Sequence, residues 1–258
     1  MPDKNHGPAE REVIILQRLK EHGYVTVSDL SERLDVSEVT VRKDLQKLEG
    51  RNLLHRTYGG ANVRDPYVRD RPLDEKVTQF TEEKQRIGKA AANLVAARDS
   101  IILASGTTMT QVARHLRDKS ELTVITSAMN VALEVAHLQD VEVLMLGGMV
   151  RRTSKSVVGP YAQEMMKEYA CDKLFLGVDG FDLDHGLTTA NAPEAHLNQY
   201  MIRAAQRVII VTDSSKFGRR SLRRICGLDA VHRVITDASV DEHIVSHLKE
   251  QGIYVDVV

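Results

Sequence analysis

The segment from Val25 to Ala61 constrains the fold most strongly, because it predicts a helix, a tight turn, a second helix and a hairpin in succession. Ser37 stands where a helix N-cap is expected, since its hydroxyl can accept a backbone N–H of the first turn. Asp35 is expected to end the preceding helix, and Val36 to fill the turn between the two helices. Apolar residues recur at spacings of two to four, and the last four are expected on one face of a helix that begins near Glu38. These apolar positions are Leu30, Leu34, Val36, Val39, Val41, Leu45 and Leu48.

The polar side chains of the second helix suit the major groove of DNA. Thr40, Arg42, Lys43 and Gln46 fall away from the expected apolar face. Arginine can fork to a guanine edge, threonine can contact bases or phosphate, and lysine can neutralise backbone charge. Six Lys or Arg stand against two acids between Arg42 and Arg64, in a chain whose formal net charge is −1. The local positive excess favours a nucleic-acid surface. The alternative is a solvated amphipathic helix with ordinary pairs, such as Asp44 with Lys47.

A short basic hairpin is expected after this helix. Asn52 can adopt the left-handed conformation that closes a helix, and the extended segment that follows carries Arg56 and Tyr58. Gly59 and Gly60 are expected to form the turn, because glycine tolerates positive φ and lets the backbone approach a phosphate closely. The segment therefore predicts the wing of a winged helix-turn-helix, with a plain surface hairpin as the alternative.

The string VSEVTVRKDLQKLE followed by LLHRTYGGA resembles the signature of the DeoR family of bacterial transcriptional regulators. The resemblance implies a recognition helix that contains Ser37, Val39, Thr40, Arg42 and Lys43. It implies a wing that contains Arg56, Tyr58, Gly59 and Gly60. The chain departs from the family at Asn52, where glycine is usual, but asparagine also tolerates left-handed geometry.

The length of 258 residues and the composition favour a small N-terminal domain and a larger second domain. We expect a DNA-binding domain over 1–62, a linker over 63–76 that is rich in charge and proline, and an α/β domain over 77–258. No run of about 18 apolar residues and no secretory h-region occurs, so we expect a cytoplasmic protein without a membrane partner. Cys171 and Cys226 lack any metal-ligand spacing, so we expect reduced, buried thiols and no metal site.

Strand-like and helical segments alternate after residue 100, which predicts a mostly parallel, Rossmann-like sheet in an α/β fold. Each predicted strand is a short apolar run, and the intervening segments are mostly long enough for helices. The predicted strands are Ile101 to Leu103, Leu122 to Thr126, Val141 to Leu146, Leu174 to Val178, Val208 to Thr212, Arg233 to Thr236 and Gly252 to Val257.

Ligands of such sheets bind beyond the carboxyl ends of the strands, and these positions are unusually polar here. Glycine beside hydroxyls at a helix start favours a phosphate cradle, and carboxylates accept sugar hydroxyls. Lys216 or Arg152 would hold the phosphate. We therefore expect a phosphorylated sugar, with helix caps, structural ion pairs or a solvated pair at Arg151 and Arg152 as alternatives. The candidate residues are Ser105, Gly106, Thr107, Thr108, Ser127, Gly147, Gly148, Arg152, Asp179, Gly180, Asp213 and Lys216.

The family resemblance extends through this domain. The strings LGGMVRRTSKSVVGP, GVDGFD, GLTTAN with Glu194, and TDSSKF are similar to the family's effector-binding domain. The resemblance implies a fold related to ribose-phosphate isomerases and amino-sugar-phosphate deaminases, a sensor of phosphorylated sugars, and a site role for Glu194. The chain departs from the family at Ala104, where aspartate is common, and at Ser127, where asparagine is common.

We therefore predict a DNA-binding transcriptional regulator that represses a carbohydrate-utilisation operon and needs no cofactor or catalytic residue. It would bind a double-stranded DNA operator as a homodimer or homotetramer, because one recognition helix supplies few base contacts. One alternative is a sugar-phosphate isomerase or deaminase with an appended DNA-binding domain, in which Asp179 and Asp213 would be general bases. Another is a DNA-binding protein whose larger domain binds no ligand.

Overall fold

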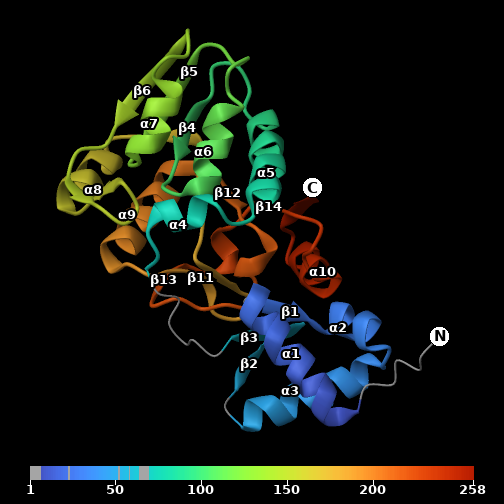
Figure 1. Cartoon of the computed structure of the whole chain (residues 1–258). Helices are drawn as coiled ribbons and strands as arrows, with labels where there is room; N and C mark the ends of the chain where they lie inside the picture. The colour runs from blue at the N-terminus through green and yellow to red at the C-terminus, as the bar shows by residue number, and fades with distance from the viewer. Residues whose placement is uncertain (1–6, 23, 52, 58, 64–69) are drawn as a thin grey trace.

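The computed structural model describes residues 7–258, except residues 23, 52, 58 and 64–69. Two parts are distinct in Figure 1: a small N-terminal head, and a larger body in which helices cover a sheet. The head contains three helices and a three-stranded antiparallel sheet with the strand order β1-β3-β2. Its elements are α1 (Pro8–His22), β1 (Tyr24–Thr26), α2 (Val27–Leu34), α3 (Glu38–Gly50), β2 (Leu54–Thr57) and β3 (Gly60–Val63).

The predicted helix-turn-helix is confirmed by α2 and α3. Asp35 adopts left-handed geometry with φ of 52°, which ends α2. The Ser37 hydroxyl accepts a hydrogen bond from the Thr40 backbone N–H at 3.3 Å, so Ser37 is the N-cap of α3. Val36 is half-buried and packs against the head core. The two helices are therefore joined at the turn that the sequence predicts.

One residue of the predicted apolar face lies elsewhere. Val39 is 60% exposed, whereas Val41, Leu45 and Leu48 are buried. The prediction was wrong because Val39 and Val41 stand two residues apart, which turns their side chains about 200° from each other on a helix. The fourth buried position is Asp44, whose carboxylate pairs with the Arg11 guanidinium, with Nε and Oδ2 2.7 Å apart.

The predicted wing is confirmed as a hairpin of β2 and β3, although Asn52 and Tyr58 lie outside the described residues. The expected positive φ is wrong for Gly60, because Gly60 is a strand residue that pairs with Thr26 of β1. A Cβ at Gly60 would lie 1.9 Å from the Val25 carbonyl oxygen. Glycine is therefore required there by the close approach of two strands. A Cβ at Gly59 would similarly meet the Asp241 carboxylate of the body.

The body is built on a parallel sheet of seven strands, and each of the seven predicted strands corresponds to one of them. The spatial order is β15-β14-β12-β9-β4-β5-β6. The fold class predicted from the sequence is thus confirmed. The strands are β4 (Ser100–Leu103), β5 (Leu122–Thr126), β6 (Val141–Met145), β9 (Cys171–Leu176), β12 (Ala205–Val211), β14 (Arg233–Thr236) and β15 (Tyr254–Val257).

Helices cover both faces of this sheet, so it has a core on each side. Ile101 and Leu103 face the layer of α5, α6 and α7, while Ile102 faces the layer of α8, α9 and α10. This alternation follows from the two-residue period of a strand. The helices are α5 (Thr81–Asn93), α6 (Thr107–Arg114), α7 (Met129–Val135), α8 (Pro160–Lys167), α9 (Ala192–Ala204) and α10 (Glu242–Glu250).

Several short elements were not predicted from the sequence. Two hairpin strands follow β6, three more strands form a small antiparallel sheet, and a short helix overlaps the end of the interval that we expected to be a linker. They are β7 (Met149–Arg151) and β8 (Ser156–Val158), then β10 (Gly180–Asp182), β11 (Gly186–Thr189) and β13 (Arg223–Cys226), and finally α4 (Leu73–Val77). Two 3-10 turns, Ser214–Lys216 and Leu228–Ala230, complete the body.

Both cysteines are free thiols. Cys171 is buried as expected, but Cys226 is only half-buried. Burial raises the pKa of Cys171 to about 11 and that of Cys226 to about 12. Both side chains are therefore protonated at neutral pH. Within the described part of the chain, no helix has the length and apolar character that a membrane span requires.

Candidate effector site and DNA-binding surface

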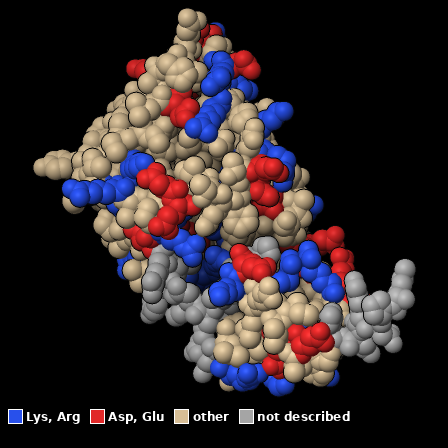
Figure 2. All heavy atoms as spheres, viewed as in Figure 1, with Lys and Arg blue, Asp and Glu red and all other residues tan. Residues whose placement is uncertain are grey.

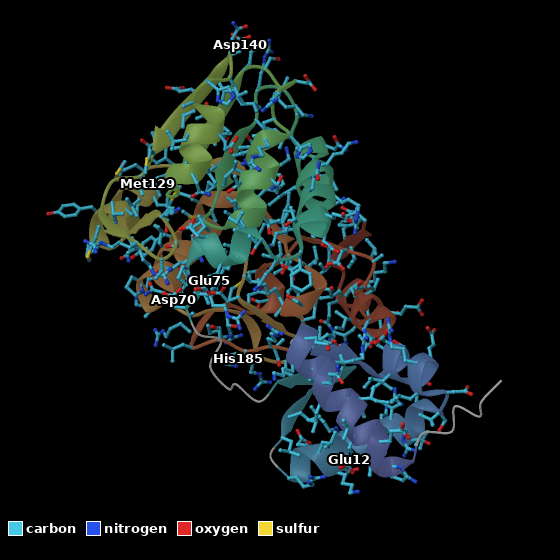
Figure 3. The ribbon with its side chains drawn as sticks, viewed as in Figure 1. Glu12, Asp70, Glu75, Met129, Asp140 and His185 are labelled. Carbon is cyan, nitrogen blue, oxygen red and sulfur yellow. The ribbon has the colours of Figure 1, made fainter. Side chains whose placement is uncertain are left out.

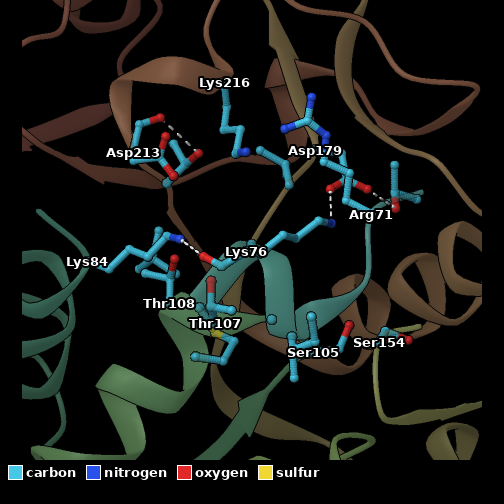
Figure 4. A pocket seen from close by; sticks show the side chains of 18 of the residues that line it. Arg71, Lys76, Lys84, Ser105, Thr107, Thr108, Ser154, Asp179, Asp213 and Lys216 are labelled. Carbon is cyan, nitrogen blue, oxygen red and sulfur yellow. Dashed lines mark hydrogen bonds and ion pairs between the residues drawn. The ribbon is translucent and has the colours of Figure 1, made fainter. Parts of the chain in front are cut away.

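A polar pocket lies at the carboxyl ends of β4, β9 and β12, the three middle strands of the sheet. Figure 4 shows that α4 and the start of α5 contribute one side of this pocket, and that Lys216 reaches it from the opposite side. The charged residues that line it are Asp70, Arg71, Lys76, Lys84, Arg151, Asp179, Glu194, Asp213 and Lys216. The pocket thus combines cations and carboxylates at the edge where α/β sheets bind ligands.

The N-terminus of α6 forms the hydroxyl-rich side of the pocket. Gly106 precedes α6 with φ of 132°, a conformation that glycine adopts without strain. Ser105, Thr107 and Thr108 line the pocket around it. The first amides of a helix have no intrahelical acceptor and favour anions, so this arrangement suits a phosphate or carboxylate.

Asp179, which follows β9, is held in its ionised form. Its Oδ1 lies 2.8 Å from the Lys76 Nζ, and its Oδ2 accepts hydrogen bonds from the Thr189 hydroxyl and the Ala190 N–H at 2.9 and 3.0 Å. Burial by itself raises the pKa of Asp179, but the charge and hydrogen bond of Lys76 outweigh burial and lower that pKa to about 2. Asp179 is therefore ionised at neutral pH and is a very weak base.

Glu194, in the first turn of α9, joins two walls of the pocket. Its Oε1 accepts a hydrogen bond from the Ser105 hydroxyl at 2.6 Å, and its Oε2 pairs with the Arg151 guanidinium. Burial raises the pKa of Glu194, and the nearby charge of Asp179 raises it further. The same guanidinium also pairs with Asp70, so Arg151 bridges two carboxylates.

Lys84 extends from α5 into the same pocket with little exposed surface. Its Nζ donates to the backbone carbonyl oxygens of Lys76 and Gln79, each at 2.6 Å. Burial is the main cause that lowers the pKa of Lys84, to about 8, and the neighbouring charges of Lys216 and Lys76 also lower it. Lys84 thus fixes the position of α4 over the pocket.

The strand ends at β4, β9 and β12, together with the start of α9, bring eight predicted site residues together. These are Ser105, Gly106, Thr107, Thr108, Asp179, Glu194, Asp213 and Lys216. Asp213 is buried after β12, where its carboxylate accepts the Ser215 N–H at 3.2 Å and the Ser215 hydroxyl. Asp213 therefore caps the turn that presents Lys216 to the pocket.

Five predicted residues lie outside the pocket lining. They are Ser127, Gly147, Gly148, Arg152 and Gly180. The first four follow β5 and β6, which occupy one side of the sheet, away from its middle strands. Ser127 uses its carbonyl to accept the Val157 N–H of the β7–β8 hairpin at 2.8 Å. Gly180 belongs to β10, where a Cβ would lie 2.5 Å from the Arg219 carbonyl oxygen.

The β7–β8 hairpin explains why Arg151 lines the pocket and Arg152 does not. Consecutive residues at a strand end point to opposite sides, and here Arg152 is exposed while Arg151 is mostly buried. Sequence reasoning also missed Arg71, Lys76 and Lys84, which precede the sheet. The density of Lys and Arg after residue 70 was a signal, but the absence of hydrophobic period led to a linker assignment for the interval that contains Arg71 and Lys76, and a search of strand ends does not reach Lys84.

The head presents Lys and Arg at the lower edge of Figure 2, over α3. Arg42, Lys43 and Gln46 of α3 are exposed, as expected for a groove-facing helix. Acidic residues outside the segment from Arg42 to Arg64 reduce its positive excess. Arg42 lies 2.7 Å from Glu38, and Lys47 lies 2.7 Å from Glu12 rather than pairing with Asp44. In the wing, the Arg56 N–H donates to Glu49 at 2.9 Å, and the Arg56 side chain is half-exposed.

Two family models match the chain. A DeoR-like helix-turn-helix domain matches residues 11–66, and a DeoR C-terminal sensor domain matches residues 79–238. The chain belongs to the DeoR family. It is 40% identical over 255 residues to a putative aga operon transcriptional repressor of Escherichia coli O157:H7, which covers 98% of this chain and 94% of that protein. The glycerol-3-phosphate regulon repressor of Escherichia coli K12 is 30% identical over 243 residues, or 94% of this chain and 96% of that protein.

The DeoR-family chain is thus a DNA-binding transcriptional regulator, and the main functional prediction from the sequence is confirmed. Among solved structures, ribose 5-phosphate isomerase from Plasmodium falciparum matches 53% of this chain and 52% of its own length. The sequence identity is 17% and the TM-score is 0.40.

Proposed function

We propose that this DeoR-family regulator represses a carbohydrate-utilisation operon and that a phosphorylated sugar in the body pocket controls its binding to an operator. The observation that carries the proposal is the composition of the pocket. Lys216, Lys76 and the amides at the start of α6 face one space, together with hydroxyls and carboxylates. Cations and helix amides bind phosphate, while Asp179 and Asp213 accept sugar hydroxyls.

We propose binding without turnover in this pocket, and therefore no catalytic residue and no cofactor. The rival proposal of an isomerase or deaminase needs a carboxylate that accepts a proton from carbon. Asp179 suits that role poorly, because a pKa of about 2 makes the carboxylate a weak base at neutral pH. Conversion of any sugar phosphate by the purified protein would contradict our proposal.

A thermal-shift panel tests the effector. We expect the full-length protein to melt at a higher temperature with one phosphorylated sugar than with its unphosphorylated counterpart, because a native-state ligand stabilises by mass action. Lys216→Ala should remove the shift, since Lys216 lines the pocket. Arg152→Ala is the matched control: it removes an exposed cation outside the lining and should keep the shift. An equal loss in both variants would contradict the proposed site.

The recognition helix is tested by Arg42→Ala on an operator selected from a random DNA pool. We expect a loss of about 1–3 kcal/mol in binding, or roughly five- to 150-fold, and relaxed specificity, because an arginine fork to guanine is a main source of base discrimination. Arg98→Ala is the control, since Arg98 is also an exposed arginine in a surface ion pair, with Glu121 in the body. Equal affinity for Arg42→Ala and wild type would show that Arg42 does not read the operator.

We propose that the chain acts as a homodimer or homotetramer on two operator half-sites. A single α3 contacts few bases, and paired heads raise the number of base contacts. Analytical ultracentrifugation measures the assembly directly. A monomer at concentrations that saturate the operator would contradict this part of the proposal.

A further inference from the structure

Residues 70–80, which we name the strap, cross the pocket and tie it to the chain that leaves the head. The Leu73 N–H donates to the Thr153 carbonyl oxygen at 2.7 Å, and Lys76 pairs with Asp179 at 2.8 Å. Lys84 holds two strap carbonyls. Asp70 begins the strap seven positions after Val63, the last residue of the head sheet. Figure 3 labels Asp70 next to Glu75, above His185 of the body.

Arg151 is the point where the strap meets the anion-binding part of the pocket. Its side chain is only 11% exposed and pairs with both Asp70 and Glu194. Its Nη1 also donates to the Ser154 hydroxyl at 3.1 Å. Both Nη1 donors and one Nη2 donor of Arg151 are therefore already directed at acceptors of the protein. An incoming anion that binds these nitrogens competes with the protein acceptors for them.

The two carboxylates on Arg151 differ in how firmly they are held. Glu194 belongs to the first turn of α9, its carboxylate also accepts from Ser105, and 16% of its side chain is exposed. Asp70 precedes α4, and 34% of its side chain is exposed. Its carboxylate also accepts a hydrogen bond from the Thr153 hydroxyl at 3.1 Å. Asp70 is therefore the carboxylate that a competing anion displaces at the lower cost.

We propose that Asp70 is an internal competitor for the effector: its carboxylate occupies Arg151 in place of the anionic group of the ligand. The inference rests on the proposed function and deepens it, because it names the contact through which the ligand acts on the chain between the domains. An anion on Arg151 and a docked Asp70 exclude each other. Ligand binding thus releases the end of the strap nearest the head. By linkage, any arrangement of the head that favours the docked strap lowers the affinity of the pocket for the ligand.

Asp70→Asn tests the competition in the full-length protein, with inorganic phosphate as the probe. The neutral amide keeps the shape of Asp70 but competes less well for Arg151, because the attraction between the carboxylate and the guanidinium charge is lost. We expect the dissociation constant for phosphate, measured by calorimetric titration, to fall by about three- to tenfold. A phosphate affinity of Asp70→Asn equal to or weaker than that of wild type would overturn the inference.

Asp74→Asn separates direct competition from a general change of charge. Asp74 lies on the same strap and pairs with Lys155 at 2.6 Å, and neither residue lines the pocket. The variant loses the same charge, and we expect its phosphate affinity to stay within about twofold of wild type because exposed pairs act weakly. An equal gain in phosphate affinity in both variants would overturn this inference but not the proposed function. Failure of wild type to bind phosphate and every sugar phosphate would overturn the proposed function as well.

Discussion

Leu48→Ala is expected to unfold the head while the body keeps its own melting transition. Leu48 is fully buried in the head core, where it packs with Ile15, Leu45 and Leu54. Removing three carbons from such a site costs about 2–5 kcal/mol, because the transfer free energy is lost and a cavity remains. A domain of this size has a total stability on the order of 3–8 kcal/mol, so most of the head's stability would be lost.

Differential scanning calorimetry and DNA binding measure this result together. We expect the transition of the head to fall sharply and operator binding to disappear at 37 °C, whereas the thermal shift caused by the effector persists. Val39→Ala is the matched control for the calorimetric transition, because Val39 lies on the same helix, is 60% exposed and leaves no cavity when it is truncated. If Leu48→Ala also removed the effector-induced shift, the head and body would not be independent folding units.

The free energy of unfolding of the body is expected to rise by at most about 3 kcal/mol between pH 8 and pH 10.5 through Lys84. Burial lowers the pKa of Lys84 from 10.5 to about 8 in the folded state. Within this window the unfolded chain keeps the proton on Lys84 and the folded chain loses it. Stability rises with pH wherever the unfolded state binds more protons, and one pKa unit corresponds to about 1.36 kcal/mol.

Urea denaturation at a series of pH values measures the contribution of Lys84 by comparison with two variants. Lys84→Met should lack the rise, because methionine does not titrate. Lys89→Met should keep it, since Lys89 is exposed on the same helix. A wild-type curve parallel to that of Lys84→Met across this window would show that the pKa of Lys84 is not lowered in the folded state.

The elements that the sequence predicts well are those in which one physical rule dominates. Each buried strand of the body is a short apolar run, and Ser37 caps α3 because a hydroxyl there satisfies a free amide. The misplaced Val39 shows the limit of counting apolar residues without tracking the helical angle. The strands β7 and β10 have three residues each, too few for a period to be recognised.

The sequence predicts those residues of the candidate site that directly follow a strand, and it does not predict the others. The residues after β4, β9 and β12 line the pocket because carboxyl ends of parallel strands share an edge. The order of the strands in space decides which strand ends lie at the middle of the sheet. The residues around Ser127 and Gly147 hold no information on that order. Lys76 and Lys84 precede every strand of the body, so the same rule overlooks them.

The order of strands in the body also determines when the two parts of a new chain can fold. Within the head sheet, the most distant paired residues are Tyr24 and Asn62, so its strands can pair once about 65 residues have been synthesised. In the body, Ile101 of β4 pairs with Lys173 of β9, and the middle of the sheet waits until that strand is complete. Domains fold from the N-terminus as synthesis proceeds. During each round of translation, the DNA-binding head can therefore fold before the sheet of the body is complete.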